Sequence, residues 1–207
     1  MALGGDLAGQ EAVKLPAPLV LASSSPQRRA ILEQLGLPFE VVEPSYEERD
    51  DGDLSPVELV RSHAAGKARS VADAVGDRLV LGVDTAVVVG DRILGKPRDQ
   101  EEAAAMLGLL GGRAHTVVSG LCLRSSGREA VEHEETSVVF RPLAPQEIEA
   151  YVATGEWQGR AGAYAIQSEG ASLVERIEGD YLNVVGLPAA LLVRLLADRF
   201  PGTEVSG

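Results

Sequence analysis

Hydroxyl and cationic side chains gather at one point of the sequence, directly after a short apolar run at positions 19–22. The segment is Ser23-Ser24-Ser25-Pro26-Gln27-Arg28-Arg29, in which Ser25 can cap a helix and Pro26 can occupy its first position. Free N–H groups and the positive dipole end of such a helix attract anions, and two arginines would add charge-assisted hydrogen bonds. The spacing fits an anion pocket and an ordinary capped helix with surface arginines equally well.

A single carboxylate, Asp84, interrupts the apolar segment from Leu79 to Val89. Burying a lone carboxylate is costly unless a cation, a metal or hydrogen-bond donors compensate it, and nothing beside it in the sequence does so. Aspartates with a purely structural role also occur at strand ends. We favour a catalytic or metal-binding role, because such sites perturb carboxylate pKa values and use them as a general base or a ligand.

Four further signals are weak when each is taken alone. Lys96 precedes Pro97 and can either reach phosphate oxygens as a point charge or be a solvated turn residue. Lys67 lies one helical turn after His63, so the two can share a face, although a solvated lysine is the commoner case. Glu48 lies in an acidic loop, where carboxylates can bind a hard cation such as Mg²⁺ or simply be solvated. His115, after a Gly-Gly-Arg turn, fits a capping or packing role.

The elements that must position these groups follow from apolar periodicity and helix-end residues. Strands are predicted over 19–22, 39–42, 79–89, 93–94, 116–123, 130–140 and 171–177, and helices over 26–35, 56–75, 100–110, 145–152 and 188–199. Strands alternating with helices and then pairing with each other indicate a mixed sheet with helices around it. We expect a single two-lobed domain over 17–200, with a flexible tail over 1–16 and a C-terminal tail over 201–207.

Composition and charge limit the class of partner. The chain has 207 residues, of which 45% are hydrophobic, and a formal net charge of -12. It therefore lacks the broad basic face that a nucleic-acid polymer or an anionic membrane requires, whereas a few cations or a metal can still dominate one cleft for a small anion. The single cysteine, Cys122, lies in an apolar run and is predicted to be buried and inert. A lone cysteine and a start without a signal-peptide pattern together predict a cytoplasmic protein.

In order and spacing, these pieces resemble the Maf family of nucleotide pyrophosphatases from about residue 19 to 197. Each motif alone is modest, but the ordered set is highly specific. Besides Lys67, it consists of LVLASSSPQRR (19–29), GVDT (82–85), GKPRD (95–99), EAAAML (102–107), GRAHTV (112–117), AGAYAIQ (161–167) and GDYLNVVGLP (179–188).

The resemblance implies a fold like that of the inosine-triphosphate pyrophosphatases, in which an elongated mixed β-sheet is flanked by helices in two lobes with a central cleft. It also implies a homodimer, a divalent metal cation (Mg²⁺, Mn²⁺ or Co²⁺) and attack of water between the α and β phosphates of a nucleoside triphosphate. In the matching positions, Asp84 is the proton acceptor near the metal, Glu48 is a carboxylate near the metal, and the triphosphate is held by Ser23, Ser25, Arg28, Lys67 and Lys96. A further acid of the family, two or three residues before Glu48, is Ser45 here.

Three positions separate the branches of the family, and here they are Gln27, Thr85 and Gln167. Thr85 and Gln167 match the branch that favours dTTP and UTP, whereas Gln27 matches neither the arginine of that branch nor the tryptophan of the 7-methyl-GTP branch. The resemblance thus implies a pyrimidine or modified nucleotide as substrate. The alternatives are a pyrophosphatase specific for 7-methyl-GTP, a phosphatase or nucleotidyl transferase, and a nucleotide-binding regulator of cell division.

Overall fold

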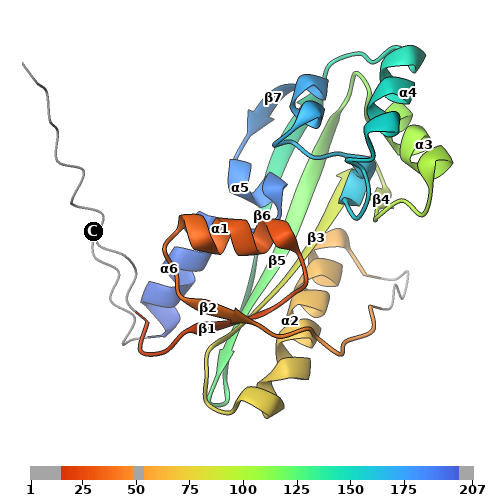
Figure 1. Cartoon of the computed structure of the whole chain (residues 1–207). Helices are drawn as coiled ribbons and strands as arrows, with labels where there is room; N and C mark the ends of the chain where they lie inside the picture. The colour runs from red at the N-terminus through yellow and green to blue at the C-terminus, as the bar shows by residue number, and fades with distance from the viewer. Residues whose placement is uncertain (1–14, 49–53, 201–207) are drawn as a thin grey trace, which may run out of the picture.

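A mixed sheet of seven strands runs through the part of the chain that the computed structural model describes, residues 15–48 and 54–200 (Figure 1). The strand order is β2-β1-β3-β5-β6-β7, and the short β4 pairs with the end of β3. Strand β1 is parallel to β2 and β3, whereas the pairs β3–β5, β5–β6 and β6–β7 are antiparallel. The strands are β1 (Leu19–Ala22), β2 (Phe39–Val41), β3 (Val80–Val89), β4 (Arg92–Leu94), β5 (Ala114–Ser125), β6 (Arg128–Phe140) and β7 (Val174–Glu178).

Capping side chains mark where the first three helices begin, as the sequence predicts. Ser25 caps α1, Ser55 and Glu58 form a complete capping box at α2, and Asp99 caps α3. Each side-chain oxygen accepts a hydrogen bond from an otherwise unpaired N–H group of the first turn. The helices are α1 (Pro26–Gln34), α2 (Pro56–Val75), α3 (Gln100–Leu110), α4 (Pro145–Thr154), α5 (Tyr181–Val185) and α6 (Ala189–Arg199), with the 3-10 turns η1 (Ala161–Ala163) and η2 (Glu169–Leu173).

Alternate side chains of β1 enter two different apolar layers, because successive residues of a strand point to opposite faces. Leu19 and Leu21 pack with residues of α1 and α6, whereas Val20 and Ala22 pack with residues of α2. A separate core around Phe140 lies under α3 and α4. Figure 1 shows α1 and α6 near one end of the sheet and α3 and α4 near the other. The predicted fold class, an elongated mixed sheet flanked by helices in two lobes, is confirmed.

Two glycines bring helix α2 directly onto the strand that carries Asp84. A Cβ atom at Gly82 of β3 would lie within 3.0 Å of three atoms of α2, and one at Gly120 of β5 would lie within 2.7 Å of three others. Gly120 is the residue of β5 that pairs with Asp84. These bare positions set α2 close enough to the sheet for one of its side chains to reach the carboxylate.

The strand predicted over 171–177 is wrong in its first part, because η2 covers 169–173 and β7 begins only at Val174. At Gly170 an added Cβ would lie within 3.1 Å of the Ala165 backbone and the Tyr151 hydroxyl. The chain turns here, because Ala171 N donates a hydrogen bond to Ser168 O at 3.0 Å and closes the 3-10 turn.

Helix α5 was not predicted. It has five residues, too few to show helical periodicity, and it is capped by Asp180, whose Oδ1 accepts a hydrogen bond from Leu182 N at 2.8 Å.

The predicted tails over 1–16 and 201–207 lie outside the described residues except for Leu15 and Pro16, and the single-domain boundary stays a prediction. Within the described ranges, no helix has the length and apolar character needed to cross a bilayer.

Candidate active site

The ten residues predicted to catalyse, to bind substrate or metal, or to set specificity all line one open cleft of about 650 Å³. Its walls come from the β1–α1 turn, α2, β3, the turn after β4, η1 and the end of α5. Segments far apart in the sequence therefore meet around a single space. The ten residues are Ser23, Ser25, Gln27, Arg28, Glu48, Lys67, Asp84, Thr85, Lys96 and Gln167.

The start of helix α1 forms one wall and presents hydroxyl and amide groups. The Ser25 hydroxyl oxygen accepts a hydrogen bond from Arg28 N at 3.5 Å, and Ser25 N donates to the Ser23 hydroxyl at 3.2 Å. The Gln27 side chain turns back on the cap, where its Oε1 accepts a hydrogen bond from the Ser25 hydroxyl at 3.1 Å. This wall combines donors with the positive end of a helix and suits phosphate oxygens.

The guanidinium of Arg28 is fixed by three elements at once. Its Nε donates to Gly186 O at 3.0 Å, and its terminal nitrogens donate to the Ser23 hydroxyl at 3.1 Å and the Thr85 hydroxyl at 3.2 Å. Burial lowers the pKa of Arg28, and the charge of Asp84 acts in the opposite direction. An arginine remains protonated in a protein, so the cleft contains a permanent positive charge with restricted orientation.

The carboxylate of Asp84 is paired with a cation from α2. Lys67 Nζ lies 2.5 Å from Asp84 Oδ1 and 2.7 Å from Glu48 Oε1, so one ammonium bridges both acids. Partial burial raises the pKa of Glu48, but the hydrogen bond and charge of Lys67 outweigh it, so that this pKa lies below its usual value. The sequence did not reveal this partner of Asp84, because the pairing depends on how closely α2 lies on the sheet.

Another part of the wall contributes Lys96 and Gln167. Gly162 N of η1 donates to Gly95 O at 3.1 Å, which ties the segment before Gln167 to the turn that carries Lys96. The positive charge of Lys96 also lowers the pKa of Glu48, so these groups share one electrostatic environment. Arg160 lines this wall too and was not singled out, because a lone arginine in a polar stretch gives no sequence signal.

His115 lies outside the cleft lining and packs behind it. It is 3% exposed, and its Nε2 is hydrogen-bonded to the hydroxyl of Tyr164, a cleft residue, at 2.9 Å. Burial lowers the pKa of His115 to about 4, so the ring is neutral near pH 7. Of the two roles that its sequence position fits, the structure supports packing.

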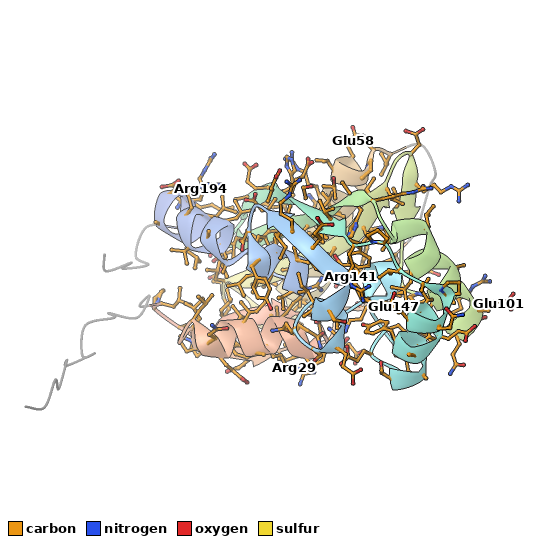
Figure 2. The ribbon with its side chains drawn as sticks, turned by 90° about the horizontal axis from the view of Figure 1, so that it is seen from above. Arg29, Glu58, Glu101, Arg141, Glu147 and Arg194 are labelled. Atoms are coloured by element: carbon orange, nitrogen blue, oxygen red, sulfur yellow. The ribbon has the colours of Figure 1, made fainter. Side chains whose placement is uncertain are left out.

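Two other sequence expectations have clear outcomes. Arg29 does not join the anion wall. It is exposed, Figure 2 shows it on the outer side of α1, and its terminal nitrogen donates to Ser24 O at 3.0 Å. Helical geometry places consecutive residues about 100° apart, so Arg28 and Arg29 cannot both face the cleft.

Cys122 is buried, as predicted, and burial raises the pKa of its thiol to about 12, which keeps it unreactive.

The acids of the cleft fit a divalent ion that is held by few protein ligands. Glu48 and Asp84 contact the same ammonium, so their oxygens converge on one small volume. Among the residues that the structure describes, no group of three or more His, Cys, Asp or Glu could form a closed metal cage. Mg²⁺ is commonly held by one or two carboxylates together with water and substrate phosphates, and this donor set matches that pattern.

Fold and cleft together define a class, an α/β protein built to hold a small polyanion beside a carboxylate. The family model described as "Maf-like protein" matches residues 18–199, so the chain belongs to the Maf family, and the predicted family is confirmed. Proteins named dTTP/UTP pyrophosphatase are similar to it. The one from Moorella thermoacetica is 51% identical over 181 residues, which cover 86% of this chain and 93% of the relative. The one from Pelotomaculum thermopropionicum is 49% identical over 180 residues, with 86% and 94% covered.

Proposed function

We propose that this chain hydrolyses the anhydride between the α and β phosphates of a pyrimidine nucleoside triphosphate, releasing the monophosphate and pyrophosphate. The observation that carries the proposal is the position of Asp84 inside a cleft that also contains Arg28, Lys67 and Lys96. Relatives that share about half of their residues with this chain over most of its length are named for dTTP and UTP as substrates.

Asp84 is the proposed proton acceptor for the attacking water. Its Oδ1 is bound to Lys67, whereas no described residue donates a hydrogen bond to its Oδ2, so one oxygen orients the carboxylate and the other is left to take a proton. General-base assistance of this kind typically contributes about 10²–10⁴ in rate.

The cations and the start of α1 are proposed to stabilise the charge that develops on the phosphate oxygens. Arg28 is held in place before the substrate binds, and such preorganised groups need no reorganisation during the reaction. Lys67 can shift from its carboxylates toward a phosphate oxygen, and Lys96, which also lines the cleft, is a second ammonium that can bind the triphosphate.

We assign the predicted divalent cation, Mg²⁺, Mn²⁺ or Co²⁺, to Asp84 and Glu48. When bound, such an ion neutralises phosphate charge and polarises the phosphoryl oxygen. Lys67 contacts both carboxylates, so the ion and the ammonium compete for the same oxygens. This competition favours entry of the ion together with the triphosphate, which offers Lys67 new partners.

Base preference is proposed to depend chiefly on Gln167. The Thr85 hydroxyl is engaged by Arg28 at 3.2 Å and by the Ser119 hydroxyl at 2.9 Å, and Gln27 Oε1 is engaged by Ser25. Both residues therefore act on the phosphate wall in the free protein, and their influence on the base would be indirect. We also propose a cytoplasmic location and a homodimer, of which light scattering of the purified protein tests the homodimer.

Product analysis tests the proposed reaction. A panel of common and modified triphosphates, including 7-methyl-GTP, is incubated with Mg²⁺, Mn²⁺ or Co²⁺, and the released phosphates are identified. We expect pyrophosphate and a monophosphate in equal amounts, with dTTP and UTP among the best substrates. Stepwise release of orthophosphate would identify a phosphatase, and tight binding without turnover would identify a nucleotide-binding regulator; either result would contradict the proposal.

A further inference from the structure

A glycine in the middle of α2 makes room for an aromatic ring from the loop that carries Glu48. Gly66 lies in the interior of α2, although glycine is a poor helix former. A Cβ atom at this position would lie within 2.7 Å of three carbon atoms of the Tyr46 ring. The absence of a side chain at position 66 is therefore what allows Tyr46 to lie against the helix.

The hydroxyl of Tyr46 is fixed on the same helix. It forms a hydrogen bond with His63 Nδ1 at 3.1 Å, and the two rings meet edge to face with their centroids 5.7 Å apart. His63 is 6% exposed and also lines the cleft. Tyr46 thus has two contacts on one turn of α2, which we call the Tyr46 seat (His63 and Gly66).

The Tyr46 seat lies directly beside the functional groups of α2. Lys67 follows Gly66, and its ammonium binds Glu48 at 2.7 Å and Asp84 at 2.5 Å. The side chain of Glu48 is 49% exposed, so burial alone does not fix it. Only one residue separates Tyr46 from Glu48 in the sequence, and a contact so close in the chain restricts where the carboxylate can go.

We propose that Tyr46 is a positioning residue whose seat on His63 and Gly66 delivers the Glu48 carboxylate to Lys67 and to the metal-binding edge of the cleft. The proposal rests on the proposed function in one respect, that Glu48 acts there on a divalent ion. Neither Tyr46 nor Gly66 is among the residues that line the cleft. Their effect passes entirely through Glu48.

Displacing the Tyr46 ring from its seat should weaken metal binding as much as removing the charge of the Glu48 carboxylate. Glu48→Gln is expected to weaken Mn²⁺ binding in the presence of a non-hydrolysable triphosphate by about tenfold or more, the range typical of groups that orient or supply metal ligands. Tyr46→Ala and Gly66→Ala should each produce a similar loss, because one removes the ring and the other displaces it. Tyr46→Phe keeps the ring and should restore most of the affinity.

The glycine gives the sharpest test, because alanine favours the helix while it excludes the ring. Gly66→Ala should therefore melt at the same temperature as the wild type or higher, yet bind Mn²⁺ less tightly. In a Tyr46→Ala background the added methyl group has no ring to displace, and Gly66→Ala should cause no further loss. The matched control is Gly108→Ala in α3, where the nearest atom to the new Cβ is Ile148 Cδ1 at 3.9 Å, and Mn²⁺ binding should be unchanged.

Mn²⁺ binding is measured by electron paramagnetic resonance, which needs no turnover, and pyrophosphate release is measured in parallel. Wild-type affinity in Gly66→Ala, or additive losses in the double variant, would overturn the positioning role of Tyr46. Failure of the wild type to release pyrophosphate would instead overturn the proposed function, and the binding data would still report on the Tyr46 seat.

Discussion

Replacing Lys67 with methionine should disable the enzyme and at the same time tighten metal binding in the absence of nucleotide. Methionine keeps much of the side-chain length and removes the charge that bridges Asp84 and Glu48. Removing one preorganised group that stabilises transition-state charge typically lowers kcat by about 10²–10³, or roughly 2.7–4 kcal/mol. We expect kcat/KM for UTP to fall by that amount.

The effect of this change on stability is smaller than that of breaking a fully buried ion pair. Such a loss costs about 3–5 kcal/mol, but the Glu48 side chain is 49% exposed and the cleft admits water to Asp84. Discounting for solvent screening gives roughly 2 kcal/mol, a decrease of about 4–8 °C in melting temperature for a domain of this size.

Metal binding distinguishes the loss of the Lys67 charge from a general disruption of the fold, because only the former should tighten Mn²⁺ binding. An ammonium about 4 Å from a bound divalent ion costs that ion ~8 kcal/mol even at an effective dielectric constant near 20, so its removal should strengthen Mn²⁺ binding without nucleotide by about tenfold or more. Arg69→Met is the matched control, because Arg69 lies on the same helix but pairs with Glu129 outside the cleft lining. A Lys67→Met protein with kcat/KM within about threefold of the wild type, or with weaker Mn²⁺ binding, would refute the bridging role.

Three other substitutions test separate parts of the cleft. Asp84→Asn should lower kcat by about 10³ while a non-hydrolysable triphosphate still binds by calorimetry, because the amide keeps the shape but accepts no proton; normal turnover would exclude Asp84 as the base. Gln167→Glu should change the ranking of dTTP, UTP, CTP and GTP by about tenfold in kcat/KM, since a carboxylate can no longer donate a hydrogen bond to the base; an unchanged ranking would place Gln167 away from the base. His115 has a pKa near 4 when folded and 6.5 when unfolded, so the unfolded chain gains its proton first and stability should fall by roughly 2 kcal/mol from pH 7 to pH 5. In His115→Asn, urea titrations should show a smaller acid loss, and an identical loss would mean that other groups cause it.

Local chemistry made much of this fold predictable. The pairs Ser25-Pro26 and Ser55-Pro56 and the acid Asp99 mark helix starts through hydrogen bonds within a few residues, and all three appear in the structure. The carboxylate of Asp84 also predicted that a compensating partner exists, because burying an unpaired charge costs free energy.

What escaped prediction depends on contacts between distant segments. The Nε of Arg28 is held by the carbonyl of Gly186, and Tyr46 meets His63 only because their segments pack together. The apolar periodicity within one segment gives no information about which distant residue it will contact. The strand expected over 171–177 failed in its first part for a local reason, because the 3-10 turn η2 occupies 169–173 and is closed by a hydrogen bond from Ala171 N to Ser168 O at 3.0 Å.

The two bare glycines beneath α2 have a practical consequence for redesign. At Gly82 and Gly120 the backbones of the helix and the sheet are in direct contact, so no side chain there can change size without moving Lys67 relative to Asp84. Mutant libraries that seek new substrates should leave these two glycines unchanged and vary the residues around Gln167. Even the methyl group of an alanine at Gly82 or Gly120 would push α2 away from the sheet. Lys67 would then be separated from Asp84, and activity would be lost whatever the nucleotide.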